Sequence, residues 1–262
     1  MPSNKALIVL QENSGRVPLP DGVPNELRDV IFGVIDRVSE TFENVKTQLQ
    51  AHRRYDVVYL HTDNACTRAN LLNAMVTETK KGRSIDLIVL GHGNAESLAL
   101  KGTATLTGGE SGNIRSLLPE AQGKGVDAFN LRLVYMCNCF GSTLNDDWAA
   151  IGAKASVGSR MNDYMPEPMT TFFVHNWLNG QKVGEAARKA YSATVPFYTV
   201  AYPPTTRVKY KTVTYKYPCP TPTSPLRMCE GKHQVPDGVE FVTNSKIVET
   251  ELVVGGNGNL KF

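Results

Sequence analysis

The sequence predicts an α/β fold with a mostly parallel sheet, and two observations lead to that prediction. Short apolar runs recur along the N-terminal part of the chain, and each has the length of a buried strand. Several of the segments between them carry apolar residues at helical spacing, which is typical of helices that pack on a sheet. Strands that alternate with helices connect through right-handed crossovers, and these crossovers produce parallel strands.

The first part of the chain is expected to contain strands at residues 5–10, 55–60 and 85–90. A loop rich in Gly and Pro follows the first strand, and apolar residues then recur from Leu27 to Leu49 with a helical period. A second helix is expected at about residues 67–81, just before the third strand.

The stretch after His92 is irregular, and its glycines indicate a small hairpin at residues 96–109. A short helix is expected at about residues 112–118, because Pro119 should end it. The remaining elements are expected as strands at 131–136 and 155–158 and helices at 144–151, 169–178 and 183–191. Prolines, Tyr/Thr/Val runs and glycine turns dominate from about residue 196, so we divide the chain into a domain at 1–195 and a β-rich extension at 196–262.

Charge and hydropathy exclude some classes of partner. The 262 residues include 28 basic and 25 acidic side chains, a net charge of +3, and no long basic run, so we expect no nucleic-acid partner. No stretch approaches eighteen consecutive apolar residues, so we expect no membrane span. The short apolar start at residues 6–10 does not resemble a signal peptide, which predicts a cytoplasmic location.

Two of the expected strands end on residues that carry chemistry. The strand at 85–90 leads into Gly91-His92-Gly93, and the strand at 131–136 leads into Cys137-Asn138-Cys139. Catalytic and binding groups of parallel sheets gather beyond the carboxyl ends of the strands. An adjacent imidazole is the usual means of activating a thiol as a nucleophile. The pattern therefore favours a cysteine-dependent enzyme.

The sequence resembles the caspase-like cysteine peptidases, the group of caspases, metacaspases, legumains, gingipains and bacterial caspase-like domains. The resemblance covers roughly residues 5–191, and its most specific parts are residues 86–93, 133–142 and 152–159. Cys139 follows His92 by 47 residues (139 − 92), close to the roughly 50 residues typical of caspases. The resemblance implies a caspase-like three-layer α/β/α sandwich with a small β-rich C-terminal extension.

The resemblance also implies a mechanism that needs no metal or other cofactor. His92 is expected as the general base or as the imidazolium half of an ion pair, and Cys139 as the nucleophile that forms a thioester acyl-enzyme. The backbone N–H groups of Gly93 and Cys139 are expected to bind the oxyanion. The partners would be peptide or protein substrates, with room for a regulatory protein.

Two choices stay open within this resemblance. Ending the apolar block at Met136 makes Cys139 the nucleophile, and ending it at Val134 makes Cys137 the nucleophile; we take Cys139. The pocket for the residue before the cut is expected to be lined by Cys137, Ser159 and Asp163. Asp163 would select a basic substrate residue, whereas Arg16 in the first loop would select an acidic one.

Other functions fit the same pattern. A caspase-fold binding module that has lost its activity would keep the same strand ends. The irregular sequence Cys139-Phe140-Gly141 is compatible with such a loss of activity. A flavodoxin-like protein would bind a small ligand at the same place. Cys66 is expected to be a buried apolar side chain, and Cys219 and Cys229 would pair if the protein were secreted.

Overall fold

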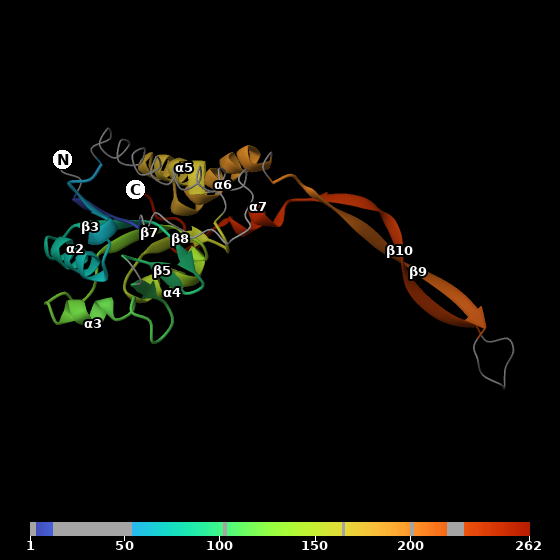
Figure 1. The fold of residues 1–262 in the computed structure, drawn as a ribbon, viewed down its shortest axis with the longest axis horizontal. Helices are drawn as coiled ribbons and strands as arrows, with labels where there is room; N and C mark the ends of the chain where they lie inside the picture. The colour runs from blue at the N-terminus through green and yellow to red at the C-terminus, as the bar shows by residue number, and fades with distance from the viewer. Residues whose placement is uncertain (1–3, 13–53, 102–103, 164–165, 200–201, 219–227) are drawn as a thin grey trace, which may run out of the picture.

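A six-stranded sheet forms the centre of the molecule, with strand order β11-β8-β7-β3-β1-β2 (Figure 1). The computed structural model describes residues 4–12, 54–101, 104–163, 166–199, 202–218 and 228–262. Neighbouring strands of this sheet pair in parallel, except that β11 runs antiparallel to β8. The strands are β1 (Lys5–Gln11), β2 (Val57–Thr62), β3 (Ser84–Leu90), β7 (Leu131–Cys137), β8 (Ala155–Ser159) and β11 (Leu252–Gly256).

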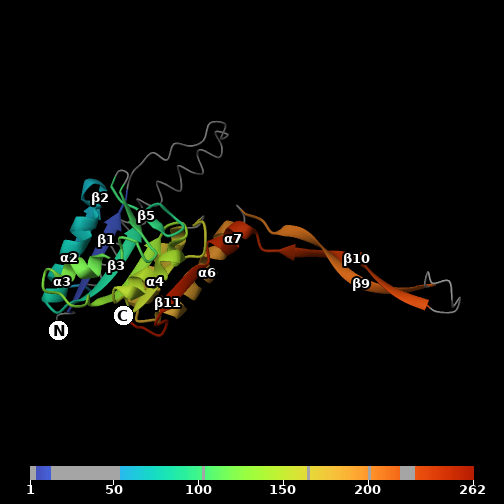
Figure 2. The ribbon, with the colours of Figure 1, turned by 90° about the horizontal axis from the view of Figure 1, so that it is seen from below.

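Helices cover both faces of the sheet, as Figures 1 and 2 show. One face carries α2 (Arg68–Lys80), α3 (Leu117–Gln122) and α4 (Asn145–Ala150), together with the short helix η1 (Asp63–Ala65). The other face carries α5 (Pro166–Leu178) and α6 (Val183–Thr199). The predicted α/β/α sandwich with a mostly parallel sheet is confirmed.

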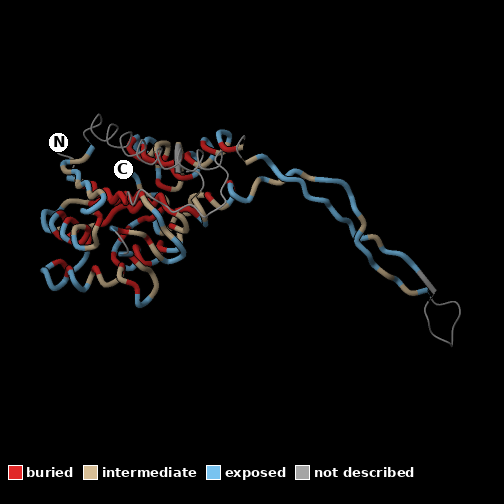
Figure 3. Tube along the Cα trace, viewed as in Figure 1, coloured by how far each residue is buried: buried red, intermediate tan, exposed pale blue. Residues whose placement is uncertain are grey.

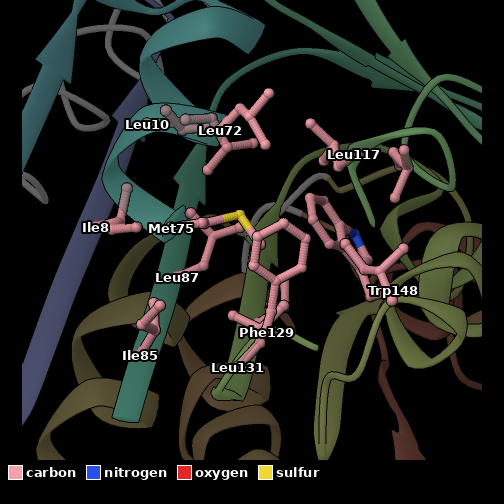
Figure 4. Close-up of a cluster of buried hydrophobic side chains, with 14 of the residues drawn as sticks. Ile8, Leu10, Leu72, Met75, Ile85, Leu87, Leu117, Phe129, Leu131 and Trp148 are labelled. Atoms are coloured by element: carbon pink, nitrogen blue, oxygen red, sulfur yellow. The ribbon is translucent and has the colours of Figure 1, made fainter. Parts of the chain in front are cut away.

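The inner strands β1, β3, β7 and β8 are buried along nearly their whole length because helices cover both faces of the sheet there. Along β1, Ala6, Ile8 and Leu10 belong to the core on the α2 side. Leu7 and Val9 point to the core on the α5 side. Figure 4 shows the first of these cores, where Trp148 and Met75 pack among leucine and isoleucine side chains of the sheet.

A small antiparallel sheet of three strands follows β3. Its strands are β4 (Gly93–Asn94), β5 (Ser97–Ala99) and β6 (Thr105–Thr107). Leu98 and Leu106 of this sheet are fully buried in the core on the α2 side. The antiparallel pairing of β5 with β6 confirms the predicted small hairpin, and its buried leucines pack it on the central sheet.

Two helix boundaries differ from the prediction. α3 begins at Leu117 and contains Pro119 in its first turn, so the proline does not end a helix there. The first turn tolerates proline because its N–H groups have no partner within the helix. The long helix predicted from Leu27 to Leu49 lies outside the described residues.

The C-terminal segment divides between the body and a projecting arm. α6 continues through Pro196 to Thr199, so the boundary suggested at 195/196 falls inside a helix. β9 (Thr205–Pro218) and β10 (Met228–Val242) then form a separate two-stranded sheet, and α7 (Ser245–Glu249) leads back to β11 in the central sheet. The arm extends far from the body, as Figures 1 and 2 show.

A buried ion pair lies between β3 and β7. Asp86 and Arg132 are 1% and 6% exposed, and Arg132 Nε donates to Asp86 Oδ1 at 2.8 Å. Tyr55 Oη and Trp177 Nε1 donate to the same carboxylate at 2.6 and 3.1 Å. Burial and the Asp86 charge raise the pKa of Tyr55 well above its usual value, so its hydroxyl stays a donor.

This pair coincides with a shift in strand register. Ile85 pairs with Leu131 and Asp86 with Leu133, so Arg132 is an extra residue in β7. The bulge places Arg132 on the α5 side of the sheet, where its guanidinium lies 5.1 Å from the Trp177 ring and 4.7 Å from the Phe262 ring. The extra residue displaces the rest of β7 by one position relative to β3.

We expect Asp86→Asn to destabilise the protein by about 3–5 kcal/mol, because it leaves the Arg132 guanidinium buried without a counter-charge. Urea unfolding followed by circular dichroism measures the change. The matched control is Glu120→Gln, which removes a charge from the exposed pair with Arg68 and should cost about 1 kcal/mol or less. Equal effects of the two substitutions would contradict this account of the buried pair.

Candidate active site

His92 and Cys139 follow the carboxyl ends of two adjacent parallel strands. Leu90, the last residue of β3, is in register with Cys137, the last residue of β7. Gly91 N donates to Cys137 O at 3.2 Å, which continues the contact beyond the strands. His92 and Cys139 each lie two residues further on, and neighbouring strands are about 4.8 Å apart. The register therefore sets the segments that carry His92 and Cys139 side by side at the carboxyl end of the sheet.

Cys137 and Cys139 differ in their exposure to solvent. Cys137 is 5% exposed and belongs to the core on the α5 side. Cys139 is half-buried, and His92 is exposed. A substrate can therefore reach Cys139 more readily than Cys137.

Glycine is required at position 93 because this residue packs closely against residues 138–140, which we call the cysteine loop. A Cβ atom on Gly93 would lie 2.3 Å from Asn138 Nδ2 and 2.8 Å from Cys139 O. The Asn138 amide donates to Cys139 O at 2.8 Å, which fixes the carbonyl of the cysteine. The absence of a side chain at 93 thus lets the two strand ends approach each other.

The cysteine loop is closed by a residue in the left-handed region. Phe140 has φ 57 and ψ 22 and precedes the short helix η2 (Gly141–Leu144). A non-glycine residue there costs about 1 kcal/mol or more, and such strain concentrates at functional sites. A Cβ atom on Gly158 of β8 would lie 2.4 Å from the Gly141 carbonyl carbon, so two glycines let the loop pack against β8.

Residues 160–163, which follow β8, connect the cysteine loop to the base of the arm. Phe140 N donates to Met161 O at 2.5 Å on one side. Met161 N donates to Glu249 O at 2.8 Å on the other side. Glu249 Oε2 also accepts from Asn162 Nδ2 at 3.0 Å, and Thr250 Oγ1 donates to Asn162 O at 3.2 Å. The segment between α7 and β11 thereby supports the loop that carries Cys139.

Burial raises the pKa of the Cys139 thiol. Asp163 acts on the thiol in two ways: its backbone N–H donates to Cys139 Sγ at 3.4 Å and lowers the pKa, while its carboxylate charge raises it. Cys137 Sγ lies 3.8 Å from Asp163 Oδ2. Burial is the largest of these effects, so the thiol pKa is raised overall.

The predicted pocket residues take different positions. Asp163 is half-buried and contacts both cysteines. Ser159 is fully buried, and its hydroxyl lies 2.7 Å from Asn138 O and 3.0 Å from Met161 O. Ser159 therefore joins the cysteine loop to residues 160–163, and Arg16 lies outside the described residues.

Two residues at the site were missed by the sequence analysis. Glu12, which is 6% exposed, directly follows β1, and its carboxylate accepts from His92 N at 3.4 Å. Asn138, which is 2% exposed, fills the space above Gly93. Glu12 could have been identified from its position just after the first predicted strand, at the same edge of the sheet as His92. Asn138 could have been identified from its position between the two cysteines.

The remaining cysteines lie away from the site. Cys66 is buried, and burial raises the pKa of its thiol to about 12. Cys229, in the arm, is disulfide-bonded, and Cys219 lies outside the described residues. Within the described part of the chain, His, Cys, Asp and Glu side chains form no group that could hold a metal ion. No described helix combines the length and hydropathy needed to span a membrane.

Comparison with known proteins gives a likeness at the level of structure. No family model and no curated protein matches the sequence. The chain is similar to the solved structure of a secreted C11 cysteine protease from Bacteroides thetaiotaomicron in complex with an irreversible peptide inhibitor, with a TM-score of 0.45 and 12% identity. The match covers 77% of this chain and 60% of that chain. The likeness concerns the fold alone.

We expect Gly93→Ala to destabilise the protein by about 1–3 kcal/mol, because the added Cβ collides with the Asn138 amide and the Cys139 carbonyl. Denaturant unfolding measures the loss. The control is Gly123→Ala, where the Cβ would meet no atom closer than 3.5 Å. That control should change stability by no more than about 0.5 kcal/mol, and a similar small change at Gly93 would contradict the close approach.

Removing the charge of Asp163 should make Cys139 more acidic. Asp163→Asn keeps the backbone N–H on the sulfur and removes the carboxylate that raises the thiol pKa. The rate at which iodoacetamide alkylates Cys139 is measured by mass spectrometry as a function of pH. Compared with the unmodified chain, we expect the midpoint of this rate–pH curve to lie at lower pH and the rate at neutral pH to be about two- to tenfold higher. Asp127→Asn, an exposed site before β7, is the control. A midpoint that stays constant or rises in Asp163→Asn would refute this sign.

Proposed function

We propose that this chain is a cysteine endopeptidase of the caspase-like group in which His92 and Cys139 form the catalytic dyad. The observation that carries the proposal is the register of β3 with β7, which sets Leu90 opposite Cys137, two residues before His92 and two before Cys139. The burial of Cys137 in the core supports Cys139 as the nucleophile. The exposure of His92 leaves its ring accessible to a substrate.

The raised pKa of Cys139 favours His92 as a general base over a preformed ion pair. In the proposed reaction the imidazole removes the thiol proton as the sulfur attacks the scissile carbonyl. His92 then protonates the leaving amine, and a thioester acyl-enzyme forms. Water, deprotonated by the same imidazole, hydrolyses the thioester and releases the acid.

The oxyanion is assigned to the backbone N–H groups of Gly93 and Cys139. Support comes from the packing of Gly93 against the Cys139 carbonyl, which brings the two backbones together. Donors fixed before the reaction stabilise the developing charge without reorganisation. The Asn138 amide, which holds the Cys139 carbonyl at 2.8 Å, would maintain this arrangement.

We further propose that the site prefers a basic residue before the cut. Asp163 is half-buried beside Cys139 and Cys137. A lysine or arginine side chain in the substrate would compensate the Asp163 carboxylate, and the same contact would remove the charge that raises the thiol pKa. Binding of a basic substrate residue would thereby assist activation of the nucleophile. Ser159 and Cys137 are buried behind this position, where Ser159 holds residues 160–163 against the loop that carries Cys139.

A catalytically inactive caspase-fold module is the second candidate. The raised pKa of the Cys139 thiol favours it, because reactive catalytic cysteines usually have a lowered thiol pKa. This candidate shares the fold and the strand ends. Turnover is the property that separates the two.

The decisive experiment incubates the purified chain with a mixed peptide library under reducing conditions and identifies the cleavage sites. We expect cleavage after basic residues, and a loss of at least about 1,000-fold in kcat/KM for Cys139→Ala and His92→Ala. Cys137→Ala is the matched control and should keep most of the activity. Full activity of Cys139→Ala would overturn the dyad, and no turnover by the unmodified chain would favour the inactive module.

Partners and location follow from this proposal. The proposed substrates are peptides or proteins, and a regulatory protein partner is compatible with the fold. It stays a prediction that the protein needs no nucleic acid, membrane, metal or cofactor. The cytoplasmic location also stays a prediction. The disulfide at Cys229 is an observation against it, because such bonds persist mainly in oxidising compartments.

A further inference from the structure

The arm formed by β9 and β10 has no core of its own. Its strands are 14 and 15 residues long and pair only with each other within the described chain. At about 3.4 Å per residue, the arm is roughly 45 Å long. Figure 3 shows it as exposed or intermediate along its described length. An isolated two-stranded ribbon is at best marginally stable in water, so this arm is expected to pack against another surface.

The strand register separates the side chains near the base of the arm into two faces. Directly opposed residues of an antiparallel pair share a face. On one face Thr206 is opposite Phe241, Val208 is opposite Val239, and Tyr210 is opposite Pro236. The apolar arm face consists of Val208, Tyr210, Pro236, Val239 and Phe241.

The apolar arm face is open to solvent. Phe241 is 81% exposed, Val239 63%, Tyr210 62% and Val208 44%. These side chains are adjacent along and across the two strands, so they form one patch. A contiguous exposed apolar patch on a folded protein marks an interaction site.

The charges of this region are compensated within the arm. On the opposite face, Arg207 contacts Glu240 at 2.5 Å and Lys209 contacts the same carboxylate at 3.5 Å. Lys211 contacts Asp237 at 2.7 Å. The apolar arm face carries no charged side chain, so no partner of opposite charge is required. An uncharged apolar face is complementary to a second face of the same kind, which another copy of the chain supplies.

We propose that two copies of this chain associate through their apolar arm faces, related by a twofold axis. In such an isologous contact the aromatic side chains of one arm pack on the valines of the other. Fully covered aromatic side chains bury about 150–250 Å² each, so one patch offers on the order of 400 Å² and two offer about 800 Å². That area is at the small end of protein–protein interfaces, so the proposed dimer is expected to be weak and reversible.

The test is sedimentation equilibrium of the full chain from about 1 to 200 µM, without reductant so that the disulfide at Cys229 is kept. We expect a monomer–dimer equilibrium that Phe241→Thr/Tyr210→Thr weakens at least about tenfold. Threonine maintains strand propensity, and circular dichroism checks that the variant is folded. Lys209→Thr, on the charged face of the same arm, is the matched control and should leave the equilibrium within about twofold.

Hydrogen exchange provides a second measurement. Backbone amides of β9 and β10 should become more protected as the concentration of the unmodified chain rises, and those of the double variant should not. An unmodified chain that is monomeric at the highest concentration would overturn the proposal, and the arm would then belong to a different partner. A dimer insensitive to the double variant, or one linked by a disulfide on a non-reducing gel, would overturn it as well. These readouts do not depend on peptidase activity.

Discussion

The pairing of Asp86 with Arg132 across a bulge in β7 is the constraint on which the site geometry depends. A regular ladder that began at the Ile85–Leu131 pair would set Leu90 opposite Met136, whereas the extra residue sets it opposite Cys137. Beyond the strands, the regular ladder would bring Asn138 level with His92 and turn Cys139 to the other face of the sheet. The bulge is held because Arg132 gains the Asp86 carboxylate and lies against the Trp177 and Phe262 rings.

The two ends of β3 and β7 differ in how well their polar groups are satisfied. At the end that holds Asp86, the carboxylate accepts from Tyr55, Arg132 and Trp177. At the other end, Asn138 Oδ1 is buried without a hydrogen-bond partner among the described residues, and Phe140 adopts a left-handed conformation. Strained backbone and buried groups without partners are uncommon in folded proteins and concentrate at functional sites. The end of the strand pair that the fold satisfies less completely is therefore the one that carries the candidate site.

Strand and helix positions could be predicted because they depend on local patterns. The apolar runs at β1, β3 and β7 and the residues after them placed His92 and Cys139 at strand ends. The choice of Cys139 over Cys137 depended on where the apolar block was taken to end, because a one-residue bulge leaves no signal in the apolar pattern around Arg132. The segment from residue 196 was predicted as a β-rich extension from its prolines, Tyr/Thr/Val runs and glycine turns. These local patterns carry no signal for the projection of the arm from the body, because that depends on which surfaces the strands pack against.

The arm and the cysteine loop meet at residues 160–163. β10 leads through α7 to Glu249 and Thr250, which hold Met161 and Asn162, and the next residue, Asp163, donates its N–H to the Cys139 sulfur. The N–H lowers the thiol pKa and the carboxylate raises it, so a small rotation of Asp163 changes the balance between them. Coupling between distant surfaces requires an element that both of them bias. Residues 160–163 therefore join the segment that follows the arm to the loop that carries Cys139.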